Sequence, residues 1–136
     1  MSTTTPSPSP ALVLVAHGSP DPDWSAPVIA VLDQVRAQLA EARPGAVIRL
    51  HLLSQGLPHF EDTVRDLARA GYREVRVVAY FLSGGGRHVK RDLPDYIEHV
   101  QRELPDISLV LDQPVLGEDP EVVTALAQAT LRRAQR

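Results

Sequence analysis

The sequence predicts an α/β domain, a four-stranded parallel sheet with helices on both faces. Short apolar runs alternate along the chain with segments in which apolar residues recur three and four positions apart. The first of these runs, residues 11–16, is continuously apolar, which is typical of a strand buried on both faces. Connections long enough to hold a helix join such strands in parallel through right-handed crossovers.

Four strands are expected, each of them short, rich in Val, Leu or Ile and bounded by turn residues. They are residues 11–16, 46–53, 74–82 and 107–112. Four helices are expected between and after them, each with one apolar stripe. They are Trp24–Ala42, Pro58–Ala70, His88–Leu104 and Asp119–Arg133. This order alternates strand and helix throughout, as the parallel sheet requires.

The chain divides into a tail and one domain. Residues 1–10 contain only Ser, Thr and Pro after the Met, and they have too little apolar surface to offset the entropy of ordering. We expect a flexible tail there. Residues 11–136 are of a length that forms a single domain with a core of its own.

Composition excludes several classes of function. The net charge of -3 argues against a nucleic-acid partner. The chain contains no cysteine, so any metal it binds must rest on nitrogen and oxygen ligands. No apolar run approaches the ~20 residues of a membrane span, and no basic residue precedes the short run at 11–16 as in a signal peptide. We therefore expect a cytoplasmic protein with no membrane partner.

Ligands of open parallel sheets bind beyond the carboxyl ends of the strands. The segments there are His17-Gly18-Ser19, after the first strand, and 83–88 (SGGGRH), after the third. A lone histidine in such a place more often bonds the backbone than a metal. Here His17 and His88 are expected to face each other across one crevice, and imidazole is a common ligand of divalent first-row metals.

The second segment adds anion-binding chemistry. Consecutive glycines allow close backbone approach to a ligand, and the following helix N-terminus favours negative charge. Asp92 is four residues after His88, where it could orient that imidazole from behind. By themselves the glycines are weak evidence, and their reading as a plain loop stands beside the functional one. The candidate ligand-binding residues are Ser19, Gly84, Gly85, Gly86, Arg87, Lys90 and Arg91.

These residues resemble a known family. VAHGS (15–19) and YFLSGGGRHVKRDLP (80–94) are similar to the short class II chelatases of the CbiX/SirB group, from about residue 11 to the C-terminus. The resemblance implies a chelatase-like (flavodoxin-like) three-layer sandwich. It implies a lyase that inserts Co²⁺, Fe²⁺ or Ni²⁺, as substrate, into a sirohydrochlorin-type tetrapyrrole for cobalamin or siroheme, without an organic cofactor.

By the same resemblance, His17 and His88 bind the incoming metal and assist removal of the pyrrole protons. Longer members carry two copies of the unit, so a homodimer is expected. One position departs from the family, which often has a Glu after the second strand where this chain has Ser54. Two alternatives therefore stay open: a metal or tetrapyrrole carrier without catalysis, and a domain that binds a phosphorylated ligand at the glycine loop.

Overall fold

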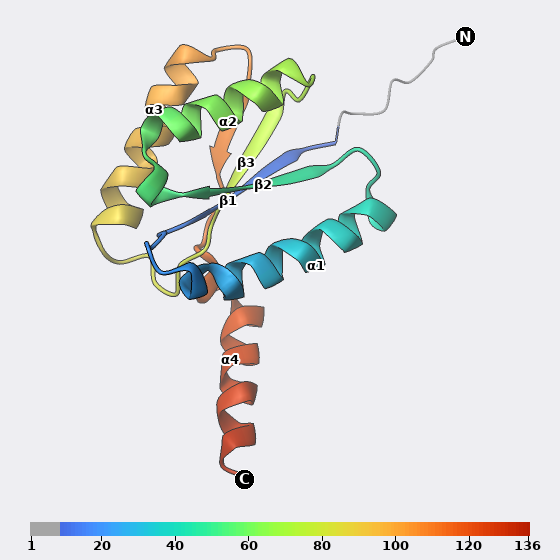
Figure 1. Ribbon diagram of the computed structural model, residues 1–136, viewed down its shortest axis with the longest axis vertical. Helices are drawn as coiled ribbons and strands as arrows, with labels where there is room; N and C mark the ends of the chain where they lie inside the picture. Colours follow the sequence, from blue (N-terminus) through green and yellow to red (C-terminus); the bar gives the residue numbers. More distant parts are fainter. Residues whose placement is uncertain (1–8) are drawn as a thin grey trace.

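The computed structural model describes residues 9–136 except for the side chain of His88 (Figure 1). Within that part, strands and α-helices alternate as the sequence predicts. The strands are β1 Ala11–Ala16, β2 Val47–Leu52, β3 Glu74–Ala79 and β4 Ser108–Leu111. The α-helices are α1 Ala26–Ala42, α2 Leu57–Arg69, α3 Leu93–Glu103 and α4 Pro120–Arg133. Most of the predicted flexible tail, residues 1–8, lies outside the described residues.

The strands form one parallel sheet in the order β2-β1-β3-β4. This confirms the predicted fold class. The central strand β1 is an uninterrupted apolar run, because both of its edges are paired and both of its faces are covered. In register, Val15 of β1 pairs with His51 of β2 and Ala79 of β3, so three strands end at the same level.

Helices cover both faces of the sheet, as predicted (Figure 1). α2 and α3 pack on one face through their apolar stripes, which include Phe60, Val64 and Leu93. α1 packs on the opposite face through Val28 and Leu32. The larger of the two apolar clusters lies under α2 and α3, so that face forms most of the core.

α4 stands apart from these layers. It begins at Pro120, and Asp119 is its N-cap residue. The Asp119 side chain accepts a hydrogen bond from the Glu121 N–H at 2.8 Å. From there it extends away from the sheet and ends at the C-terminus (Figure 1). None of its residues is buried.

Three predicted boundaries were wrong: the end of the third strand and the starts of the first and third helices. The third strand ends at Ala79 rather than residue 82, because β1 ends at Ala16 and offers no further partner. The third helix opens with a π-helical turn, His88–Asp92, since Pro94 has no N–H for the carbonyl four residues back. Pro27 has the same effect on the first helix, where a 3-10 turn, Pro22–Ser25, precedes α1.

Candidate functional site

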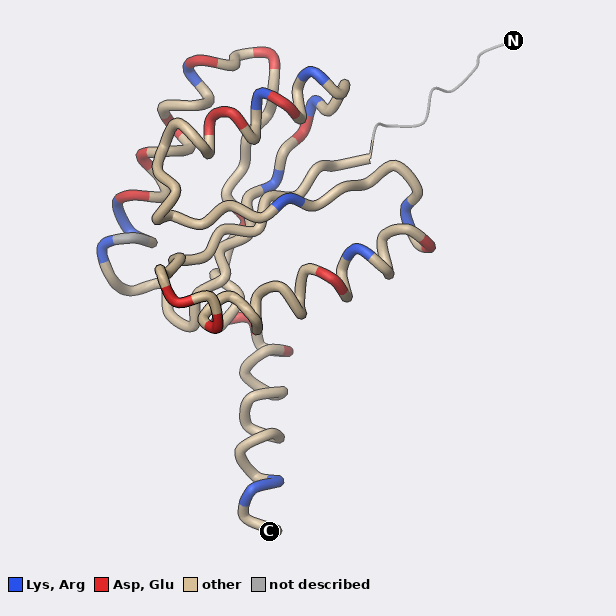
Figure 2. Tube along the Cα trace, in the orientation of Figure 1, with Lys and Arg blue, Asp and Glu red and all other residues tan. Residues whose placement is uncertain are grey.

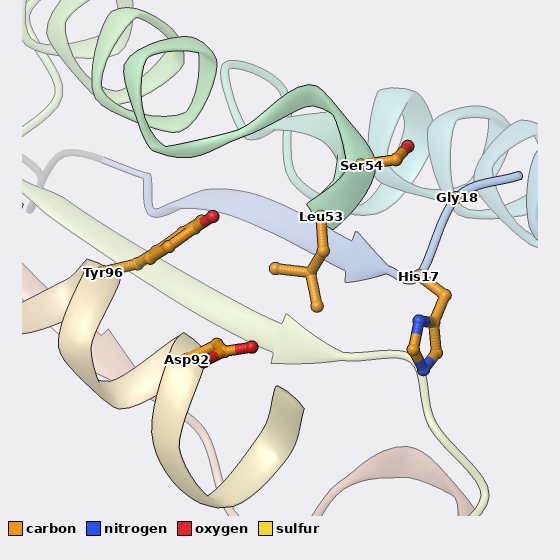
Figure 3. Close-up of a pocket in the computed structure, with 6 residues that line it drawn as sticks. All are labelled: His17, Gly18, Leu53, Ser54, Asp92 and Tyr96. Atoms are coloured by element: carbon orange, nitrogen blue, oxygen red, sulfur yellow. The ribbon is translucent and has the colours of Figure 1, made fainter. Parts of the chain in front are cut away.

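A cleft of about 230 Å³ opens at the carboxyl ends of the strands. The residues that line it come from the ends of β1 and β2 and from the start of α3 (Figure 3). They are His17, Gly18, Leu53, Ser54, Asp92 and Tyr96. The chain runs from β1 outward to β2 and then crosses to β3 on the other side, so the cleft lies at the switch point where ligands of such sheets bind.

His17 is the first residue after β1, and its side chain is exposed. Its ring meets that of Phe81 edge to face, with 5.3 Å between the ring centroids. Its backbone carbonyl accepts a hydrogen bond from the Ser54 N–H at 3.0 Å. Gly18 follows at φ +90°, and a Cβ there would overlap the Ser54 side chain. The backbone of His17 is therefore held between the ends of β1 and β2, which fixes where the imidazole stands.

Asp92 brings a carboxylate into the same cleft. It ends the π-helical turn, and its side chain points into the space that His17 also borders (Figure 3). The sequence predicted a place behind His88 for this carboxylate. The cleft position gives Asp92 access to a ligand as well. Tyr96, four residues further on, lines the cleft from the same helix face, a spacing that would have found it.

His88 opens the π-helical turn, and its side chain lies outside the described part of the chain. The basic residues beside it, Arg87, Lys90 and Arg91, are all exposed and surround this turn. The backbone of this stretch is coloured blue at the edge of the molecule (Figure 2). Positive charge is thus gathered around the turn that ends at Asp92, in a protein whose net charge is negative.

The glycine loop is held from within the chain. The Gly84 N–H donates to Oε1 of Glu118 at 2.8 Å, and the Gly85 N–H donates to Oγ of Ser83 at 3.0 Å. Gly86 has φ +93°, which turns the loop into the following helix. The hydroxyl of Ser19 accepts a bond from the Asp21 N–H at 3.1 Å. The first two glycine N–H groups are thus engaged by the chain's own oxygens.

A second pair of histidines lies behind the cleft and was not predicted as a pair. The Nδ1 atoms of His51 on β2 and His59 on α2 are 2.8 Å apart, with ring planes 22° apart and centroids 5.0 Å apart. Those values place the two nitrogens head to head, as in an N–H···N hydrogen bond. His51 is fully buried, and its Nε2 has no hydrogen-bond partner. Burial, and then the charge of His59, lowers the pKa of His51 to about 4.

The fold and the cleft define an α/β ligand-binding domain with a histidine and a carboxylate at its switch point. Among the residues that the structure describes, no three His, Cys, Asp or Glu side chains form a group that could hold a metal ion. No helix in the described part is long and apolar enough to span a membrane. Imidazole and carboxylate are both common ligands of divalent metals.

The CbiX family model matches residues 11–133, so the chain belongs to the CbiX family. Among solved structures, it is similar to a protein from Marinobacter aquaeolei VT8 ascribed to cobalamin (vitamin B12) biosynthesis as a CbiX protein. The TM-score is 0.69 at 24% identity, over 93% of this chain and 98% of that one. A search of curated proteins by sequence finds no match.

A second similar structure is the sirohydrochlorin chelatase SirB from Bacillus subtilis subspecies spizizenii, in complex with cobalt. Its TM-score is 0.69 at 25% identity. The match covers 91% of this chain but 50% of SirB, so this chain spans about half the length of that chelatase. Both comparisons agree with the family that the sequence motifs resemble.

Proposed function

We propose that this protein inserts a divalent metal ion, Co²⁺, Fe²⁺ or Ni²⁺, into a sirohydrochlorin-type tetrapyrrole. The observation that carries the proposal is the cleft itself: His17 and Asp92 line one space at the switch point of a CbiX-family domain. The cobalt complex of SirB supports a divalent metal as substrate. Membership of the family supports metal insertion into a tetrapyrrole as the general activity.

His17 and His88 are proposed to bind the incoming metal through imidazole nitrogens. Few protein ligands suit this task, because the metal must leave for the four pyrrole nitrogens. A neutral imidazole that has released the metal can accept a pyrrole proton, and so can the carboxylate of Asp92 in the same cleft. Asp92 also remains the candidate to orient His88 from the following turn.

The basic residues beside His88 are proposed to bind the acidic side chains of the tetrapyrrole. Arg87, Lys90 and Arg91 are exposed and can reach a bound anion. Because the Gly84 and Gly85 N–H groups are engaged within the chain, we assign these side chains the larger share of anion binding and the glycines the shaping of the loop. Ser19, bonded to the Asp21 N–H, remains a candidate substrate contact beside His17.

A carrier without catalysis is the second candidate, and one observation favours it. Ser54 lines the cleft where the family often has a glutamate, so the cleft has one carboxylate fewer. A missing carboxylate weakens metal binding or proton acceptance. The SirB chain is about twice as long as this one, so we expect two copies of this chain to act together.

Absorbance spectra of sirohydrochlorin with Co²⁺, Fe²⁺ or Ni²⁺ test the proposal directly, with and without the purified protein. We expect faster metallation than in buffer, and loss of that acceleration in the His17→Ala and His88→Ala variants. Pigment or metal that binds without accelerated metallation would instead establish the carrier. Undiminished turnover in both variants would exclude these histidines as the centre.

A further inference from the structure

The turn Leu116–Glu118, which lies between β4 and α4, bonds the segment after β3 at two points. The Gly117 N–H donates to the Phe81 carbonyl at 2.8 Å. The Gly84 N–H donates to Oε1 of Glu118, also at 2.8 Å. The turn therefore holds the chain just after β3 and again at the first glycine of the loop.

The turn itself has little freedom, because the residues around it are packed. Val115, directly before it, is 2% exposed and belongs to the larger apolar cluster. Leu116 packs against the smaller cluster, which lies under α1 on the opposite face of the sheet. A Cβ at Gly117 would overlap the Leu82 backbone, so the turn and the loop are in close contact. Dense packing of this kind resists displacement, so the backbone of Glu118 is held firmly beside the loop.

The glycine loop depends on such bonds for its order, because the consecutive glycines 84–86 have more backbone freedom than any other residue type. The bond from the Gly85 N–H to Oγ of Ser83 lies within the loop. The bond to Glu118 comes from another element, and its charged acceptor makes it stronger than a bond between neutral groups. Its loss should increase the motion of the loop and of the chain that continues to His88.

The two bonds of the turn lead toward both of the proposed metal-binding histidines. Phe81, whose carbonyl the turn binds, meets the His17 ring edge to face at 5.3 Å between centroids. Gly84 lies four residues before His88. Groups that bind one ligand together must be held to within about 0.5 Å of their working positions. The turn is in position to set the distance between the two segments that carry these histidines.

We propose that Glu118 is a positioning residue of this site, which holds the glycine loop so that His88 is presented opposite His17. It acts through the Gly84 N–H and not through contact with the metal or the tetrapyrrole. It follows β4, whereas the described residues that line the cleft come from the ends of β1 and β2 and from the start of α3. This role rests on the proposed function, because it assumes that the two histidines bind the metal.

Calorimetric titration with Co²⁺ alone tests this role without turnover. Glu118→Ala removes the bond and is expected to raise the dissociation constant for Co²⁺ by about three- to tenfold. Glu118→Gln removes the charge but keeps an oxygen that can accept the Gly84 N–H, so its dissociation constant should stay within about twofold of the wild type. Glu121→Ala is the matched control, because Glu121 has the same charge and is exposed in the first turn of α4. Its affinity for Co²⁺ should be that of the wild type.

Hydrogen exchange of the loop gives a second readout that needs no metal. Peptides that cover residues 83–88 should take up deuterium faster in Glu118→Ala than in the wild type or in Glu118→Gln. The midpoint of urea unfolding should be the same in all three, which separates positioning from a general loss of stability. Wild-type exchange and wild-type affinity in Glu118→Ala overturn the proposal. Equal losses in Glu118→Gln and Glu118→Ala also overturn it, because the charge and not the bond would then be responsible.

The wild-type protein distinguishes failure of this role from failure of the proposed function. If it binds Co²⁺ but does not accelerate metallation, the chelatase proposal fails, while a weaker affinity in Glu118→Ala still supports the positioning role. A wild type that binds no Co²⁺ overturns both.

Discussion

Two histidines, one just after β1 and one within the neighbouring β2, have opposite environments. His17 follows β1 and is exposed in the cleft, whereas His51 lies within β2, in register with Val15, and is fully buried. Exposure leaves His17 able to meet a metal or a proton donor. Burial holds His51 neutral, with a pKa lowered to about 4, and bonded to His59. The same type of side chain is thus buried in the core on one strand, whereas at the end of the neighbouring strand it is exposed and is our proposed metal ligand.

The largest expected effect is on the metallation rate, when His17 is replaced. His17→Ala should lower metallation by about 10²-fold or more, since it removes a proposed metal ligand and proton acceptor. Its free energy of unfolding should change by less than about 0.5 kcal/mol, because an exposed side chain is lost. Metallation rates and urea unfolding on the same preparation measure both. A large loss of stability would make His17 a structural residue instead.

The converse effect is expected at His51. His51→Ala should lower the free energy of unfolding by about 2–4 kcal/mol, because it opens a cavity beside Phe60 and leaves Nδ1 of His59 without its partner. His51→Leu is the matched control: it keeps most of the volume and removes the unpartnered Nε2, and should cost less than about 1.5 kcal/mol. Both variants lose the bond to His59, so equal losses would mean that the cavity contributes nothing.

The pH dependence of stability tests whether burial keeps His51 neutral. The pKa of His51 falls from 6.5 to about 4 on folding, so between these values the unfolded chain binds the proton more readily than the folded one. Protonation of His51 therefore does not affect the free energy of unfolding above pH 6.5. As the pH falls from 6.5 toward 4, the free energy of unfolding decreases by up to about 3 kcal/mol. Urea unfolding from pH 7 to 4 should show a smaller slope in His51→Leu. An unchanged slope would assign the pH dependence to other groups.

The smallest expected effect concerns the cleft's missing carboxylate. Ser54→Glu should raise the affinity for Co²⁺ by about tenfold if one added carboxylate contact contributes about 1.4 kcal/mol. Ser54→Gln matches it in length without the charge and should leave the affinity near that of the wild type. Calorimetric titration with the metal alone measures this. Equal affinities in the two variants would show that the side chain at position 54 does not reach the metal.

Much of the site was visible in the sequence because it depends on local order. A histidine directly after an apolar run is placed at the end of a strand by chain connectivity alone, as His17 is. Asp92 was found by its spacing from His88, although the π-helical turn places its carboxylate in the cleft itself. Leu53 and Tyr96 were missed as lining residues. Leu53 reads as one more apolar residue at a strand end, and Tyr96 as part of an amphipathic stripe.

The sequence by itself determined the alternation of strands and helices, hence the parallel sheet, and the segments that border the cleft. Those features follow from periodicity and connectivity along one stretch of chain. Only the tertiary structure decided that His51 meets His59 and that Glu118 bonds the glycine loop. It also decided that α4 projects away from the sheet, with none of its residues buried. Such contacts join residues far apart or on different elements, and their energy depends on packing and burial that no local pattern records.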